Sequence, residues 1–310
     1  MNSPTAPRQP WDVLGIGANS IDFVTVVPAF PRPEGWYSKM QIQRHLVTCG
    51  GQTATAMAVC ARFGLKARYI GAVGSDENGQ RVLADLPRHG VDASGVVTRG
   101  GRNQFAVIVI DGQSGERAVL WDRDTKLELR EDDVPLDVIA GARVLHVDDV
   151  DQAAAIRAAC HARRLGIPVT SDLDRMTDRT AELVEAVTYP IFADGLHEKL
   201  TGTADHEEAL RRLRRPHHRA LCITVGQHGA LALAGDRFFH SPGFKVDAVD
   251  TTGSGDVFRG AFIYALLQGW DIDQTLRFAN AAAALACTGV GAMAGIPALE
   301  PSLALAGIAG

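Results

Sequence analysis

Short apolar runs of strand length alternate with amphipathic stretches of helical length along most of the chain. The apolar runs cover residues 12–16, 67–72, 105–110, 144–147, 169–171, 191–193 and 221–225, and the helical stretches cover 53–63, 79–89, 152–165 and 207–213. This alternation predicts an α/β fold around a mostly parallel sheet. Sheets of this kind bind ligands at the carboxyl ends of their strands.

Two parts of the chain break the alternation. Residues 23–27 and 39–47 have the pattern of strands but are joined by a turn-rich segment, and residues 104–121 have the pattern of a β-hairpin. Such strands predict a small antiparallel sheet outside the parallel core, which would cover an active site and exclude water. Strands that only extend the edge of the main sheet explain the pattern equally well.

Composition indicates a soluble, cytoplasmic protein. Of 310 residues, 46% are hydrophobic and 22% are charged, and the net charge of −5 includes no basic surplus for nucleic acid. No stretch approaches the about 18 uninterrupted apolar residues of a membrane span, and the polar N-terminus has no signal core. Five scattered cysteines without metal spacing fit free thiols.

The most informative motif is Gly253-Ser254-Gly255-Asp256, which stands before an apolar helical run. Small residues there leave the first N–H groups of the helix accessible, and the positive end of the helix dipole favours an anion. A carboxylate beside an anion would weaken simple binding. Asp256 is therefore interpreted as a base that takes a proton from a hydroxyl attacking a phosphoryl group, with an ordinary Gly-rich turn as the alternative.

Two segments near the N-terminus offer polar ligand contacts. Gly50-Gly51-Gln52 precedes a run of small helical residues, so its backbone and the Gln52 amide could approach a polar ligand closely. Asn19 and Asp22 follow the first strand, and a carboxylate such as Asp22 can accept hydrogen bonds from two hydroxyls of a polyol. A tightly packed turn and a surface aspartate are the competing interpretations.

Nucleotide binding would use neither of the common glycine-rich motifs. Gly15 and Gly17 resemble the start of a dinucleotide fingerprint, but Ser20 replaces its third glycine and a β-like run follows where the helix should begin. A Walker A loop is absent from the sequence. The turn after Thr224, with Gly226 and Gly229, could instead let the backbone pass close to a nucleotide.

Together these motifs resemble those of the ribokinase/PfkB family of carbohydrate kinases, over roughly residues 13–297. The Gly253–Asp256 turn is similar to the family's C-terminal signature, with Ser254 where alanine is commoner. The N-terminal signature is matched by Gly50 and Gly51, with Gln52 in place of the usual asparagine. The resemblance implies one domain over 1–310, a three-layer α/β/α sandwich with a mostly parallel central sheet and a small β-lid from about 22–48 and 101–122.

The resemblance also implies an activity and a set of site residues. The activity would be transfer of the ATP γ-phosphate to a hydroxymethyl group of a small sugar, with Mg²⁺ and, in many members, K⁺. Asp256 would be the base and Gly253, Ser254 and Gly255 the anion hole. The sugar would bind at Asn19, Asp22, Gly50, Gly51 and Gln52. The nucleotide would bind at Thr224, Gly226, Gly229 and Asn280. A monovalent cation would bind at Asp250 and Thr252.

One departure and three alternatives remain. The family's Asn-x-x-Glu motif lacks its asparagine here, because the chain has Gly195-Leu196-His197-Glu198, as in ketohexokinase-like members without the motif. The alternatives are a sugar or nucleotide sensor, a nucleoside kinase using Phe30, Trp36 and Tyr37, and a phosphosugar kinase using Arg32, Lys39, Arg44 and Arg123. Some members also form a homodimer through the lid strands.

Overall fold

The computed structural model describes residues 10–309, except for the side chain of Tyr37. Its central layer consists of two four-stranded sheets. The first is fully parallel, in the order β10 (Val169–Asp172), β9 (Ala142–Asp148), β1 (Trp11–Ile16) and β4 (Ala67–Ile70). The second has the order β11 (Ile191–Ala193), β12 (Leu221–Thr224), β13 (Ala230–Ala234) and β14 (Arg237–Ser241).

The two sheets meet between β10 and β11. The amide of Leu173 donates to the carbonyl of Ile191 at 3.0 Å, and the amide of Ala193 donates back to Leu173 at 2.8 Å, so the strands run on as one layer. The pair β11–β12 is parallel, whereas β13 and β14 add antiparallel strands at the edge. The predicted α/β fold with a mostly parallel sheet is therefore confirmed.

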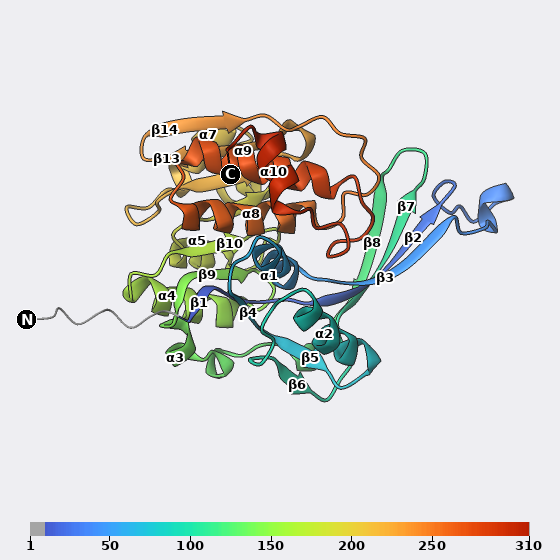
Figure 1. The fold of residues 1–310 in the computed structure, drawn as a ribbon, viewed down its shortest axis with the longest axis horizontal. Coiled ribbons are helices and arrows are strands. Elements are labelled where there is room, and N and C mark those ends of the chain that lie inside the picture. Colours follow the sequence, from blue (N-terminus) through green and yellow to red (C-terminus); the bar gives the residue numbers. More distant parts are fainter. Residues whose placement is uncertain (1–9, 310) are drawn as a thin grey trace, which may run out of the picture.

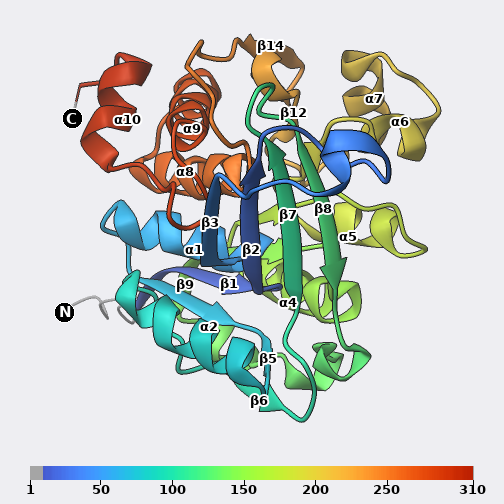
Figure 2. The same cartoon turned by 90° about the vertical axis from the view of Figure 1, so that its right-hand side faces the viewer.

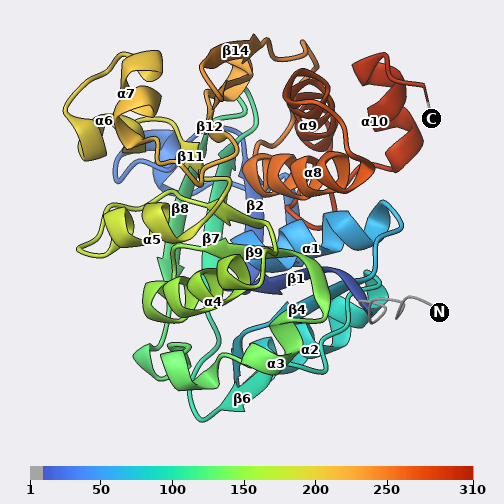
Figure 3. The ribbon, with the colours of Figure 1, turned by 90° about the vertical axis from the view of Figure 1, so that its left-hand side faces the viewer.

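Helices cover both faces of this layer. One face is covered by α1 (Gln52–Arg62), α8 (Ser254–Gln268) and α9 (Ile272–Ala286), with α10 (Leu299–Ala306) packed on α9. The other face carries α3 (Leu136–Ile139), α4 (Gln152–Arg164), α5 (Thr180–Ala186), α6 (Leu196–Thr201) and α7 (His206–Leu213). Figures 1 and 3 show α9, α8 and α1 one above the other. The result is the predicted three-layer α/β/α sandwich.

Close packing of small residues holds α1 against α8. The residues of α1 from Thr53 to Cys60 are all buried, and most of them are alanine or threonine. A Cβ atom at Gly260 of α8 would lie 2.5 Å from the Val59 side chain and 2.8 Å from the Ala56 carbonyl oxygen. Only glycine allows this approach, so the two helices are fixed relative to each other.

A separate four-stranded sheet projects from this body (Figures 1 and 2). Its order is β3 (Arg44–Gly50), β2 (Ser20–Val27), β7 (Phe105–Asp111) and β8 (Arg117–Asp122). The expected purely antiparallel arrangement is wrong, because β2 and β7 are parallel. The strand expected at 39–47 also begins later, at Arg44, after a 3₁₀ turn over Gly35–Ser38.

The two faces of this projecting sheet differ. Val24, Ala106, Ile108 and Ile110 form a buried apolar cluster with Val290, which belongs to the loop after α9. All six residues of β8 are exposed. The projecting sheet therefore packs one face on the body of the protein.

The remaining elements complete the lower part of the molecule in Figure 1. They are α2 (Glu77–Arg88) and the parallel pair β5 (Ala72–Gly74) and β6 (Val97–Arg99). Ser20 starts strand β2 rather than a helix, so the dinucleotide fingerprint is indeed incomplete. Within residues 10–309, no helix has the length and apolar character needed to cross a membrane.

Candidate active site

The start of α8 has the geometry of an anion site. Gly253, the N-cap residue, has a left-handed backbone with φ of 76°, and no side chain caps the first turn. A Cβ atom at Gly253 would lie 2.6 Å from that of Ala292, so glycine is needed for close approach as well as for conformation. The first N–H groups of α8 therefore keep their capacity to bind a negatively charged group.

Asp256 lies in this first turn, partly accessible, among other carboxylates. Burial, and then the negative charge of Asp172, raise the pKa of Asp256 well above its usual value, while the Arg259 guanidinium acts in the opposite direction. A carboxyl group with a raised pKa is a stronger proton acceptor once it is ionised. The environment thus suits a general base.

A buried ion pair lies next to Asp256. Nη2 of Arg259, one helical turn further along α8, is 2.9 Å from Oδ1 of Asp172 at the end of β10, and these side chains are 3% and 4% exposed. Burial raises the pKa of Asp172 to about 6, against the charge of Arg259 and a hydrogen bond from Gln52. Asp172, Arg259 and Gln52 therefore belong to the same polar cluster as Asp256.

The side chain of Asp22, in β2, fits only because its neighbour on the adjacent strand is a glycine. Its side chain is 5% exposed and accepts a 2.7 Å hydrogen bond from the Ser20 hydroxyl. A Cβ atom at Gly50, on the adjacent strand β3, would lie 2.0 Å from Oδ2 of Asp22. Burial, followed by repulsion from Asp250, raises the pKa of Asp22 to about 6. Asp22 can accept hydroxyl donors when it is ionised.

The loop from Gly51 into α1 lies directly against Asn19. Gly51 has φ of 94°, and a Cβ atom there would be 2.4 Å from Cα of Asn19. The Asn19 side chain donates to the Tyr69 hydroxyl at 2.9 Å and the Ala72 carbonyl at 2.8 Å, and it accepts from Asn103. The Asn19 amide is therefore hydrogen-bonded within the protein. Gln52, in contrast, lies close to Asp172.

The predicted nucleotide residues also come together. Gly226 and Gly229 flank a short 3₁₀ turn after Thr224, and a Cβ atom at Gly229 would lie 2.1 Å from the Ser241 carbonyl oxygen. The amide of Asn280, on α9, donates to that same carbonyl at 2.9 Å. Asn280 therefore fastens the end of β14 beside the glycine turn. The Thr224 hydroxyl is used within the sheet, where it donates to the Phe192 carbonyl at 3.3 Å.

Asp250 and Thr252 join two loops in front of α8. The Asp250 carboxylate accepts 2.8 Å hydrogen bonds from the amides of Thr252 and Gly291, and the Cys287 carbonyl accepts from Val249 and Asp250. The Thr252 hydroxyl is buried, and the described part of the chain offers it no hydrogen-bond partner. An unpaired hydroxyl beside a carboxylate and the carbonyls after Cys287 fits the donor set of a monovalent cation.

The projecting sheet reaches this region through the β7–β8 hairpin. The Arg117 guanidinium of β8 donates to the Thr251 hydroxyl, two residues before Gly253. Phe30, residues 114–117, Val119 and Thr251 line a cavity between the hairpin and that loop. The sheet therefore borders the start of α8.

Residues named in the alternative interpretations have different positions. Phe30 lines the cavity just described, whereas Trp36 is 94% exposed in the 3₁₀ turn between β2 and β3. Glu198, of the incomplete Asn-x-x-Glu motif, is exposed on α6. Arg123 binds both oxygens of Asp151, at 2.8 and 2.7 Å. Tyr37 has its side chain outside the described residues.

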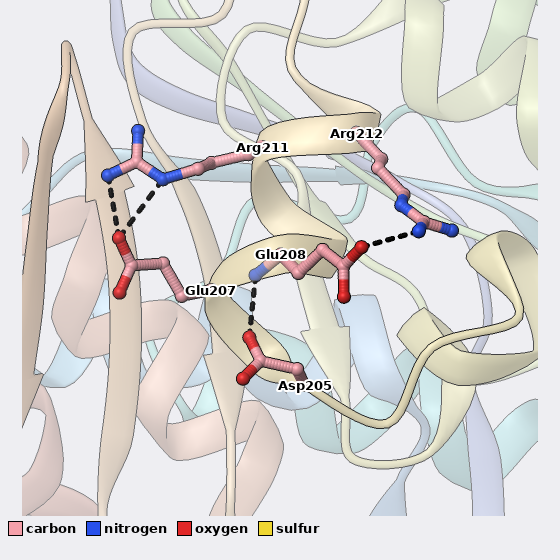
Figure 4. A pocket seen from close by; sticks show the side chains of 5 residues that line it. All are labelled: Asp205, Glu207, Glu208, Arg211 and Arg212. Atoms are coloured by element: carbon pink, nitrogen blue, oxygen red, sulfur yellow. Dashed lines mark hydrogen bonds and ion pairs between the residues drawn. The ribbon is translucent and has the colours of Figure 1, made fainter.

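A second pocket is a surface feature of α7 (Figure 4). Its lining consists of Asp205, Glu207, Glu208, Arg211 and Arg212, paired with one another or capping the helix. This pocket is made of ordinary surface ion pairs and adds no group to the site around α8.

Sequence reasoning missed the buried acidic cluster and its arginine. Arg259 is the only charged residue between Asp256 and the end of α8, which is a usable signal in an otherwise apolar helix. Asp148 and Asp149 at the end of β9 are almost completely buried, and burial raises the pKa of Asp149 to about 7. Carboxylates at two neighbouring strand ends could have been expected to meet at one edge of the sheet.

Comparison with known proteins gives one consistent result. The family model described as pfkB family carbohydrate kinase matches residues 12–299. The crystal structure of a ribokinase candidate from Agrobacterium tumefaciens has 30% sequence identity to this chain and superimposes on it with a TM-score of 0.89. The match covers 96% of this chain and 97% of that chain. Fructokinase-1 of Zea mays is 28% identical over 92% of this chain and 94% of its own length.

A third relative has a phosphorylated sugar in its name. The ATP-dependent ribose-1-phosphate kinase of Halopiger xanaduensis is 28% identical over 88% of this chain and 90% of its own length. All these matches span most of both chains, so the similarity concerns the whole fold rather than a single motif.

Proposed function

Because the chain belongs to the PfkB family of carbohydrate kinases and is a sugar kinase, we propose that it transfers the γ-phosphate of ATP to a hydroxymethyl group of a small sugar, with Asp256 as the general base. The observation that carries the proposal is the placement of Asp256 in the first turn of α8, beside uncapped N–H groups. An anion site and a base on the same helical turn are the two parts that phosphoryl transfer from ATP to an alcohol requires.

The proposed chemistry is a direct transfer. The hydroxyl oxygen of the sugar bonds to the γ-phosphorus while the bond to the ADP oxygen breaks, and Asp256 accepts the hydroxyl proton. N–H groups of residues 253–255 would stabilise the negative charge that builds up on the phosphoryl oxygens. The raised pKa of Asp256 makes it an effective acceptor near neutral pH.

Sugar binding is assigned to the N-terminal half. Asp22, in its ionised form, would accept hydrogen bonds from two sugar hydroxyls, and Gly50 leaves room for its carboxylate. Gln52 lies at the start of α1, close to Asp172 and hence to the base. The projecting sheet would act as a lid that excludes water, since its hairpin already borders the loop before α8.

ATP would lie between the start of α8 and the glycine turn near Asn280. The relative from Halopiger is named as an ATP-dependent kinase, which supports ATP as the donor. Mg²⁺ would neutralise phosphate charge and be held mostly by phosphate oxygens and water. The buried acidic cluster favours cations, because the pKa values of Asp22, Asp172 and Asp256 are all raised. K⁺ would bind at Asp250 and Thr252, where the Thr252 hydroxyl lacks a partner.

The test is ADP release in a coupled assay with ATP, Mg²⁺ and K⁺. Ribose, fructose, fructose 6-phosphate, ribose 1-phosphate and adenosine form the substrate panel. Asp256→Asn should bind ATP and sugar but turn over at least ~100-fold more slowly, as expected when a general base is lost. Asp273→Asn is the matched control, because Asp273 is an exposed acid in the first turn of α9.

Each result bears on a different part of the proposal. Turnover of one sugar that Asp256→Asn loses and Asp273→Asn keeps would support both the chemistry and the substrate class. Near-normal turnover by Asp256→Asn would remove Asp256 from the mechanism. Turnover of adenosine or a phosphosugar alone would replace the proposed acceptor, and ATP binding without any turnover would favour a sensor.

A further inference from the structure

Two histidines and an aspartate meet away from α8, where β11 leads into α6 and α7. Asp194 directly follows β11, His197 lies in the first turn of α6, and His206 is the first residue of α7. Oδ1 of Asp194 is 3.3 Å from Nε2 of His206 and 3.9 Å from Nδ1 of His197. One ligand atom from each of the three side chains lies within 4.8 Å of the other two.

His197 is the unexplained member of this cluster. It is 3% exposed, and among residues 10–309 neither of its ring nitrogens has a hydrogen-bond partner. The buried His218, in contrast, satisfies both nitrogens, through the Arg215 amide at 3.1 Å and the Val184 carbonyl at 3.0 Å. A buried polar group without a partner costs about 1–3 kcal/mol, so the His197 ring lacks a contact that a ligand would supply.

The chemistry of the three groups favours a metal ion. Two imidazoles and a carboxylate suit Zn²⁺ and related divalent transition metals better than Mg²⁺ or Ca²⁺, which prefer oxygen ligands. Tetrahedral Zn²⁺ with bonds of about 2.0–2.1 Å separates its ligands by about 3.4 Å. The distances of 3.3 and 3.9 Å from Asp194 are near this value. The rings of His197 and His206 are stacked, with centroids 4.5 Å apart at 31°, so a bound ion would require them to turn their nitrogens toward it.

The surroundings give both support and access. The Asp205 carboxylate caps α7 by accepting from the Glu208 amide at 2.7 Å, and this fixes the turn that carries His206 (Figure 4). The Asp194 and His206 side chains are 58% and 35% exposed, so an ion can enter from solvent and keep a water molecule as its fourth ligand.

We propose that Asp194, His197 and His206 form a binding site for one divalent transition-metal ion, of the Zn²⁺ class, separate from the phosphoryl-transfer site. The bound ion satisfies the buried His197 ring and ties the end of β11 to the first turns of α6 and α7. Its role is to stabilise this part of the fold.

The test uses the full chain without a histidine tag, freed of metal with a chelator. Co²⁺ is titrated first, because a tetrahedral site gives it intense visible absorption, and Zn²⁺ is then added in competition. Metal content after gel filtration gives the stoichiometry, and thermal unfolding with and without Zn²⁺ gives the stabilisation. We expect one ion per chain and an increase in Tm on adding Zn²⁺.

His206→Ala and Asp194→Asn alter exposed ligands and should keep the fold, as circular dichroism would show. Each should weaken Zn²⁺ binding ~100-fold or more and abolish the Tm increase, since loss of even an outer-sphere partner costs about 10–100-fold. His161→Ala, in the last turn of α4, is the control and should bind like the wild type. Absence of binding to the wild-type chain, or equal binding by His206→Ala and the control, would overturn the proposal without affecting the kinase assignment.

Discussion

Replacing Arg259 with methionine tests how strongly the buried ion pair under the active site contributes to stability. Methionine has a similar length but no charge, so Arg259→Met removes the partner of Asp172 while largely filling the same space. The two side chains are 3% and 4% exposed and 2.9 Å apart, so solvent has little access to the position of the guanidinium. Loss of one partner from such a pair costs about 3–5 kcal/mol.

The cost should depend on pH in a defined direction. Burial, and then repulsion from Asp148 and Asp174, raise the pKa of Asp172, whereas Arg259 lowers it, so the pKa of about 6 will rise further in the variant. A carboxyl whose pKa is higher in the folded than in the unfolded state stabilises the fold only while it is protonated. The stability lost in Arg259→Met should therefore be small at pH 5, grow as the pH rises above 6, and reach its full value only above the raised pKa that Asp172 has in the variant.

Urea unfolding followed by circular dichroism at pH 5 and pH 7.5 measures this difference. Asp172→Asn and the double variant complete a double-mutant cycle. The double variant should be more stable at pH 7.5 than Arg259→Met alone, because it leaves no unpaired buried charge. A loss below about 1 kcal/mol for Arg259→Met at pH 7.5, or purely additive losses in the cycle, would refute the reasoning.

Two further predictions concern the sugar side. Asp22 must be ionised to accept sugar hydroxyls, and its pKa is about 6, so kcat/KM should fall as the pH drops through 6. The variant Asp22→Asn should have a higher KM and a flatter pH profile of kcat/KM. An unchanged profile would exclude Asp22 from sugar binding. Gly51→Ala forces a Cβ to 2.4 Å from Asn19 at φ of 94°, whereas Gly64→Ala has a similar φ of 87° and open space. Thermal unfolding should show a loss of about 1 kcal/mol for Gly64→Ala and clearly more for Gly51→Ala, and equal losses would contradict the close contact.

Local patterns predicted the parts of the fold that local physics determines. Strands β1, β9 and β12 and helices α1 and α4 follow from their apolar periodicity, and the turn before α8 was evident from its small residues. The sequence pattern did not predict strand β13, because it alternates alanine with leucine and alanine is uncommon in strands. The parallel pairing of β2 with β7 was missed because it joins segments about 80 residues apart, which periodicity does not relate.

The same limit applies to the site. Asp256 could be proposed as the base from the sequence because the glycines next to it in the chain also form the start of α8 beside it. The Arg259–Asp172 pair and the His197–His206 cluster arise where separate elements meet. The sequence marks Arg259 as a lone charge in an apolar helix, but it does not identify the partner of any of these residues. The Asn19 side chain has internal hydrogen bonds to Tyr69 and Ala72 that the sequence did not indicate, and its assignment to the sugar stays a prediction.

The contact of Gly260 with Val59 has a consequence for how this enzyme could be redirected to new acceptors. It locks α1, on the proposed sugar side, to α8, which carries Asp256, so the spacing between these two helices is not adjustable. A longer or shorter acceptor would have to be accommodated by substitutions on the projecting sheet. Directed evolution of acceptor range is therefore best confined to libraries in β2, β3 and β7, leaving the helical interface untouched.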